Sequence, residues 1–138
     1  MRGPFVVDAS VAVAWVHPAQ ATVVTKGMLQ SVRRGGIVRV PALWPLEVAN
    51  ALLVLTRRGK LVESERQDAL VWLQRLPVTI DHEMSGLAFA RLSTLACEHT
   101  ISVYDATYLE LARRLNLPLG CKDGPLRSAA RTCGVRVW

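Results

Sequence analysis

The chain has 138 residues, of which 51% are hydrophobic and 20% are charged, and 17 Lys and Arg outnumber 11 Asp and Glu. These values exclude a disordered chain, and they predict a single globular domain over residues 1–138 that buries a continuous core without covalent staples. The formal net charge of +6 predicts a basic surface, which suits a polyanion but is also common in small proteins that bind none.

Targeting segments, membrane spans and disulfides are not expected. The first apolar run is broken by Asp8 and Ser10, so it is too short for a signal peptide or a membrane span. Cys97, Cys121 and Cys133 are odd in number and share no CxxC spacing, which favours reduced thiols over zinc ligands or a disulfide framework. We therefore predict a soluble, cytoplasmic protein with no membrane partner.

Hydrophobic periodicity and turn residues predict short strands that alternate with single or paired helices. The first predicted elements are a strand at 5–7, a helix at 19–34, a strand at 37–40 and helices at 45–58 and 64–76. They are followed by a strand at 78–80, helices at 81–98 and 102–116, a strand at 119–121, a helix at 125–132 and a strand at 135–137. This alternation predicts an α/β fold with a mostly parallel central sheet and helices on both faces. Ligands of such sheets bind at the carboxyl ends of the strands.

Four acidic residues lie where an apolar segment gives way to a predicted helix start: Asp8, Glu47, Asp105 and Asp123. Taken singly, each has a structural explanation as a helix cap, a partner of the helix dipole or a turn residue. Taken together, two carboxylates about 5 Å apart repel by roughly 3 kcal/mol at an effective dielectric of about 20. Four gathered carboxylates therefore predict a hard divalent cation, and such a cation in a basic protein indicates phosphate chemistry.

Four segments of the chain resemble, in the right order, the motifs of PIN-domain ribonucleases, specifically the VapC-type toxins of bacterial and archaeal toxin–antitoxin pairs. The segments are VVDASV at 6–11, PLEVANAL at 45–52, YDATYLELA at 104–112 and DGPLRSAA at 123–130. The resemblance covers nearly the whole chain, and the series of four carries it rather than any one motif. It implies a PIN-like three-layer fold and an endoribonuclease that depends on Mg²⁺ or Mn²⁺.

The resemblance also implies roles for single residues. Asp8, Glu47, Asp105 and Asp123 would form the acidic pocket, in which the three aspartates hold one or two metal ions. Glu47 would complete the metal shell or position the attacking water, and the products would carry a 5′-phosphate and a 3′-hydroxyl. Ser10 would offer a hydroxyl to a carboxylate or a bound water, and Asn50 would orient its neighbours.

The chain departs from the family pattern at one position beside the pocket. The family often has Thr or Ser two residues before the last acid, whereas this chain has Cys121 there. The substitution weakens one supporting hydrogen bond beside Asp123.

An RNA substrate and protein partners follow from the same resemblance. It implies an antitoxin that wraps the surface beside the active site, and a homodimer, with Trp15 and Trp72 as candidates for protein contacts. Lys122 lies beside the last acid, and Arg127 and Arg131 follow at i,i+4 spacing on one helix face, so these three are candidates for binding RNA phosphates. The alternative for all three is that they are ordinary solvated cations.

Other functions are less well supported by the residues. A haloacid-dehalogenase-like phosphatase needs a second Asp two residues after the first, where this chain has Ser10. A PIN-like module that binds RNA or protein without cleavage is disfavoured by the intact set of four acids. His17, His82 and His99 lack the i,i+4 pairing of a zinc site, and no G-x-S-x-G elbow or Walker loop occurs.

Overall fold

The centre of the fold is a parallel sheet of four short strands in a computed structural model that describes residues 3–138. The strands lie in the order β3-β2-β1-β4, and their bounds are Phe5–Val7 for β1, Val38–Pro41 for β2, Val78–Asp81 for β3 and Leu119–Gly120 for β4. The interior strand β1 pairs with β2 through Phe5 opposite Val38, and with β4 through Val6 opposite Leu119. Because the strands are parallel, the loops after β1 and β4 begin side by side at one edge of the sheet.

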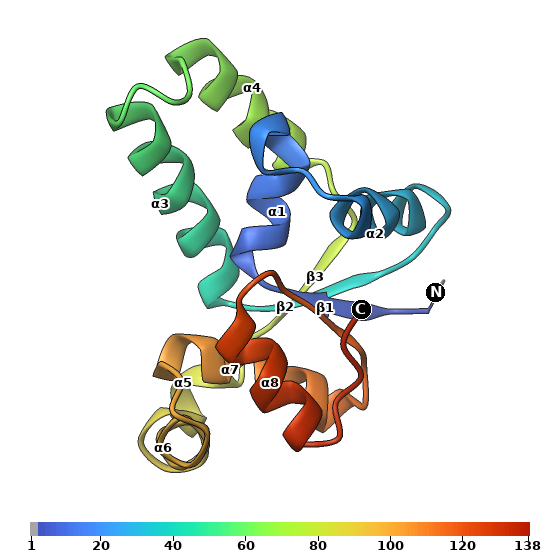
Figure 1. Cartoon of the computed structure of the whole chain (residues 1–138), viewed down its shortest axis with the longest axis vertical. Coiled ribbons are helices and arrows are strands. Elements are labelled where there is room, and N and C mark those ends of the chain that lie inside the picture. The colour runs from blue at the N-terminus through green and yellow to red at the C-terminus, as the bar shows by residue number, and fades with distance from the viewer. Residues whose placement is uncertain (1–2) are drawn as a thin grey trace.

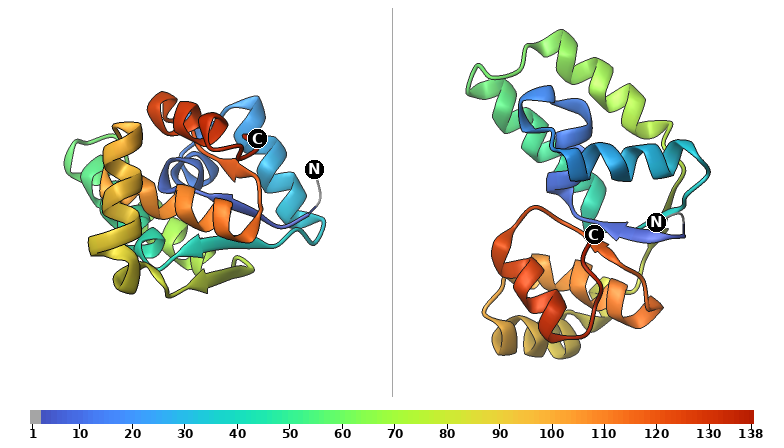
Figure 2. Two further views of the ribbon diagram at one scale, coloured as in Figure 1. Left: turned by 90° about the horizontal axis from the view of Figure 1, so that it is seen from below. Right: turned by 45° about the vertical axis from the view of Figure 1, so that its right-hand side comes forward.

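Helices cover both faces of the sheet, so the molecule has three layers (Figure 1 and Figure 2). One layer contains α1 (Ala9–Val16), a 3-10 turn (Pro18–Gln20), α2 (Val23–Arg33), α3 (Leu43–Arg57) and α4 (Glu63–Gln74). The other contains α5 (Met84–Leu87), a π-helical turn named η2 (Ala88–Leu92), α6 (Ser93–His99), α7 (Val103–Leu115) and α8 (Gly124–Thr132). In this second layer α7 packs directly on β1 and β2, and both α6 and α8 pack on α7.

The strand β1 is buried along its whole length because helices cover it on both sides. Phe5, Val6 and Val7 are completely inaccessible to solvent, as expected for a central strand of a parallel sheet. Tyr108 of α7 is also buried, and the ring of Trp138 meets that of Phe5 edge-on at 4.7 Å between centroids. The packing of β1 against α7 fixes the positions of the residues that follow β1 and of those at the start of α7.

The predicted α/β architecture is confirmed, since the sheet is parallel and lies between two helical layers. Among residues 3–138, no helix combines the length and the apolar character needed to cross a membrane.

The helix α1 was not among the predicted elements, and most predicted elements differ from the observed ones by one or more residues at their limits. Three differences have a clear structural reason. The helix predicted at 19–34 begins at Val23, because Thr22 forms a capping box with Thr25 there and residues 18–20 form a separate 3-10 turn. The helix predicted from Asp81 begins only at Met84, since Asp81 ends β3 opposite Pro41. The strand predicted at 135–137 is a single bridge between Leu119 and Val137.

Candidate active site

Asp8 stands at the point where β1 ends and α1 begins. Its backbone N–H donates to the carbonyl of Gly120 at 3.0 Å, which ties it to β4. Its side chain caps α1: Oδ1 accepts from the Ser10 hydroxyl at 2.6 Å and from the Val11 N–H at 3.3 Å. The residue is only 6% exposed, yet no described residue donates to Oδ2. The cap therefore occupies one carboxylate oxygen and leaves the other free.

Ser10 joins the two loops that leave the sheet. Besides donating to Asp8, its hydroxyl accepts a hydrogen bond from the backbone N–H of Lys122 at 3.2 Å. The hydroxyl thus fixes the carboxylate after β1 to the segment after β4. The supporting role of Ser10 in catalysis stays a prediction.

Glu47 reaches the same edge of the sheet from α3. Its side chain is half-buried, and Oε1 accepts a hydrogen bond of 2.5 Å from the hydroxyl of Tyr108. The tyrosine ring is buried in the core, so the hydroxyl is a fixed donor. Tyr108 was not among the predicted site residues, although its position three residues after Asp105 puts it on the same helix face.

Asp105 and Asp123 lie in the first turns of the two helices that follow. Ser102 caps α7 by accepting from the Asp105 N–H at 2.9 Å, and the Asp105 carboxylate is half-buried, with a side-chain hydrogen bond to Ser102 that lowers its pKa against the effect of burial. Asp123 caps α8 with Oδ2, which accepts from the Leu126 N–H at 2.9 Å, and it is exposed. Both acids therefore keep a carboxylate oxygen available.

The electrostatics link the four acids into one group. Burial raises the pKa of Asp8 to about 6, against hydrogen bonds from Ser10 and Val11 that lower it, and the charges of Asp105 and Glu47 raise it further. The pKa of Asp105 is raised by burial first and then by the charges of Asp123 and Glu47. The charges of three of the acids thus make ionisation of Asp8 or Asp105 harder, as expected for acids around a common space.

None of the cations that the structure describes forms an ion pair with this group. Among residues 3–138, Glu63, Asp81 and Glu110 have arginine partners, whereas the four grouped carboxylates have none. The same part of the chain contains no set of three or more acidic, histidine or cysteine side chains arranged so that it could hold a metal ion. The oxygen donors fit a hard divalent cation in their chemistry, but their arrangement is not a finished coordination site.

The other predicted residues, Asn50, Cys121, Trp15 and Trp72, form no hydrogen bond with the four acids in the described part of the chain. Asn50 is exposed and makes no hydrogen bond with its side chain in the described part of the chain. Cys121 is buried directly before the loop, and burial raises the pKa of its thiol to about 12, so the thiol stays protonated and unreactive. Trp15 donates from its indole to the Thr25 carbonyl at 2.8 Å, and Trp72 is partly exposed on α4.

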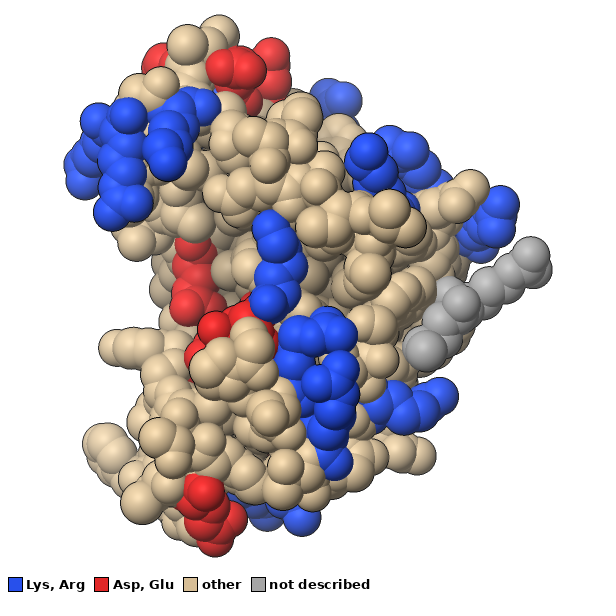
Figure 3. Space-filling model, viewed as in Figure 1, with Lys and Arg blue, Asp and Glu red and all other residues tan. Residues whose placement is uncertain are grey.

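Two of the three predicted RNA-binding cations contact the protein's own backbone. The Lys122 ammonium donates to the carbonyl of Gln20 at 2.9 Å. The half-buried Arg127 guanidinium donates to the carbonyls of Cys121 at 3.0 Å and Trp138 at 3.4 Å. Arg131 is exposed and has no side-chain partner among the described residues. Figure 3 shows basic side chains beside acidic ones in the middle of this face.

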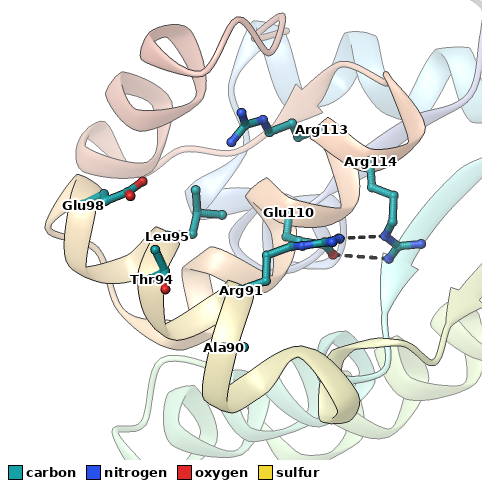
Figure 4. A pocket seen from close by; sticks show the side chains of 8 residues that line it. All are labelled: Ala90, Arg91, Thr94, Leu95, Glu98, Glu110, Arg113 and Arg114. Carbon is teal, nitrogen blue, oxygen red and sulfur yellow. Dashed lines mark hydrogen bonds and ion pairs between the residues drawn. The ribbon is translucent and has the colours of Figure 1, made fainter.

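A cavity of about 550 Å³ lies elsewhere, between η2, α6 and α7, and none of the four grouped acids lines it (Figure 4). Its buried centre is Glu110, which accepts from Arg114 at 2.7 Å and lies 3.5 Å from Arg91. Arg114 also binds Asp81 at 2.9 Å, so the network ties the end of β3 to α7. Since each central charge already has a partner, this network explains packing rather than catalysis.

Comparison with known proteins gives relatives in sequence and in fold, although no family model matches the chain. The chain is 32% identical over 126 residues to Ribonuclease VapC1 of Mycobacterium tuberculosis, strains CDC 1551 / Oshkosh and ATCC 25618 / H37Rv, which covers 90% of this chain and 89% of that protein. Its fold is similar to the crystal structure of PAE2754 from Pyrobaculum aerophilum, with a TM-score of 0.68 and 20% identity over 94% of this chain and 86% of the other. It is also similar to VapBC2 from Rickettsia felis bound to a DNA fragment from their promoter, with a TM-score of 0.67 and 11% identity over 98% of this chain and 97% of the other.

Proposed function

The chain belongs to the VapC family of PIN-domain ribonucleases, and we propose that it is a metal-dependent endoribonuclease that acts as the toxin of a type II toxin–antitoxin pair. The observation that carries the proposal is the group of Asp8, Glu47, Asp105 and Asp123 at one edge of the sheet. The charges of neighbouring acids help to raise the pKa of Asp8 and of Asp105, and no described cation forms an ion pair with the group. A binding module without catalysis would have no reason to keep this unfavourable group of charges.

The proposed ligands of Mg²⁺ or Mn²⁺ are Asp8, Asp105 and Asp123. When bound, the cation supplies charge for the scissile phosphate and promotes ionisation of the attacking water. Ser10 holds the Asp8 carboxylate so that its second oxygen points away from the cap. Helix starts hold the backbones of these aspartates near one another, but the side chains would have to close around the cation, since among residues 3–138 they are not arranged as a coordination site.

Glu47 is the proposed group that orients the attacking water. Tyr108 donates to Oε1, while no described residue donates to Oε2, which can therefore accept a hydrogen bond from water. A water held in line with the departing 3′ oxygen gives a 5′-phosphate and a 3′-hydroxyl as products. The substrate's 2′-hydroxyl takes no part in this hydrolysis.

A protein partner is proposed from the fold comparison. VapBC2 from Rickettsia felis is similar to this chain over nearly its whole length. We therefore propose that this protein pairs with an antitoxin. From the family resemblance we also propose that the active unit is a homodimer. A reading frame for a small DNA-binding protein directly upstream of the gene, and co-purification of its product, test the first of these proposals.

The activity is tested with purified wild type and Asp8→Asn on total RNA, with Mg²⁺, with Mn²⁺ or with a chelator. The expected result is cleavage by the wild type with metal only, new 5′-phosphate ends on sequencing, and no cleavage by the variant. Asp81→Asn is the control, because it removes a carboxylate outside the group and should still cleave. RNA that is bound but left intact by the wild type would instead support a non-cleaving PIN-like module.

A further inference from the structure

The basic turn is formed by the last residue of α3 and the residues that follow it, and it contains three basic side chains within four residues: Arg57, Arg58 and Lys60. All three are exposed, and in the described part of the chain none has an ion-pair or side-chain hydrogen-bond partner. Gly59 allows the chain to turn here, since its φ of 72° lies in the left-handed region. The turn therefore presents three unneutralised positive charges to solvent.

The acids that follow this turn do not offset its charge. Glu63 accepts from Arg66 at 2.6 and 2.9 Å and from Gln67 at 3.0 Å. Glu65 accepts from the Val62 N–H at 3.0 Å and so completes the start of α4. Because these carboxylates are engaged within α4, the basic turn is left available to an external anion.

The geometry of α3 aligns the basic turn with the acidic group. Arg58 follows Glu47 by eleven residues, which is about three helical turns and about 16 Å, so both lie on one side of the helix. Between them, Ala51, Val54 and Leu55 line a groove of about 400 Å³ against α1, and Ser10 and Glu47 also line it. Figure 3 shows basic side chains over the end of α3 on the same face as the central acidic side chains.

RNA flanking the scissile phosphate cannot be anchored by the acidic group itself, because its negative charges repel neighbouring phosphates. The nearby cations Lys122 and Arg127 already donate to backbone carbonyls. These bonds to neutral carbonyls orient the two side chains without cancelling their charge, and Arg57, Arg58 and Lys60 add exposed, unpaired positive charge further along the face. We propose that Arg57, Arg58 and Lys60 bind backbone phosphates of the RNA strand that extends from the acidic site along α3, a conclusion that rests on the proposed ribonuclease function.

The test compares two triple variants that each remove three positive charges, both in an Asp8→Asn background to prevent cleavage. One is Arg57→Gln, Arg58→Gln and Lys60→Gln. The matched control is Lys26→Gln, Arg33→Gln and Arg34→Gln on and just after α2, where all three cations are also exposed. Fluorescence anisotropy of a labelled single-stranded RNA gives the affinity as a function of salt, and circular dichroism with thermal unfolding verifies that both variants are folded.

The turn variant is expected to lower the slope of log affinity against log salt by about 2, since each phosphate contact of a single strand contributes about 0.7. At about 0.1 M salt the same arithmetic gives a loss of about 100-fold for three contacts and about fivefold for one. The α2 variant should retain the wild-type slope. Cleavage position in the wild-type background should be unchanged, because phosphate contacts do not identify bases.

Three results would overturn the proposal. Equal losses in both triple variants would show that only net charge matters, and an unchanged slope in the turn variant would remove the turn from the RNA path. A turn variant that keeps RNA affinity but loses a co-expressed antitoxin would assign this surface to protein recognition. Each result is separate from failure of the ribonuclease proposal, which is judged by cleavage with the unmodified protein.

Discussion

Replacing Asp8 with Asn should stabilise the metal-free protein at neutral and alkaline pH. Asp8 is almost completely buried, and its pKa in the folded protein is about 6, compared with an ordinary value of 3.8. The folded state therefore binds the proton more tightly than the unfolded state does. Protonated Asp8 therefore stabilises the fold fully below about pH 4, and this stabilisation is lost as the pH rises through 6.

The size of the effect follows from the same two pKa values. Their difference corresponds to up to about 3 kcal/mol of folding free energy that ionised Asp8 costs at high pH. Asn keeps the shape, and its side-chain oxygen can still accept the hydrogen bonds from Ser10 and Val11. We expect the variant to have a melting temperature higher by on the order of 10 °C at pH 8, with little difference near pH 4.

The assay is urea and thermal unfolding in the presence of a chelator between pH 4 and pH 8. Asp81→Asn is the matched control, because the hydrogen bond from Arg114 lowers the pKa of Asp81. That replacement should destabilise the protein at neutral pH, by an amount that shrinks as the pH falls. The electrostatic account of the site would be contradicted if wild type and Asp8→Asn had the same stability at pH 8. It would also be contradicted if the difference in their stability did not change with pH.

Two further predictions concern the other acids of the group. Tyr108→Phe removes the donor to Glu47 but keeps the buried ring, so kcat for RNA cleavage should fall by roughly 10- to 100-fold while KM changes little; a raised KM with unchanged kcat would contradict a positioning role. Asp123→Ser keeps a cap for α8 and should lose cleavage with little change in stability, whereas Asp123→Ala should also cost about 1 kcal/mol in urea unfolding. Equal stability of these two variants would show that the cap is unimportant.

The parts of the fold that could be predicted from sequence depend on local patterns. The short apolar strand before Asp8 and the cap signals at Ser102 and Asp123 lie within a few residues of the elements they start or end. Strands that alternate with helices then require a parallel sheet with covered faces. The same alternation places residues after β1 and β4 at a common edge, which is why four acids far apart in sequence could be considered together.

The parts that could not be predicted depend on contacts between distant segments. The helix expected from Asp81 begins late, and Arg114 holds that carboxylate from 33 residues away. The hydroxyl of Tyr108 reaches Glu47 across 61 residues, and no periodicity indicates that pair. Helical spacing predicted which face of α8 carries Arg127. It could not predict that the guanidinium donates to the carbonyls of Cys121 and Trp138.

The structural and the catalytic explanations of the acids are compatible because a carboxylate has two oxygens. In Asp8 and Asp123 one oxygen caps a helix, and in Glu47 one oxygen accepts from a buried tyrosine, while no described residue donates to the other. The structural bond fixes the direction in which the free oxygen points, so that orientation is set by folding and not by the ligand. This edge of the sheet therefore combines helix caps that stabilise the fold with carboxylate oxygens that remain free, and among residues 3–138 those oxygens would still have to move together to coordinate a cation.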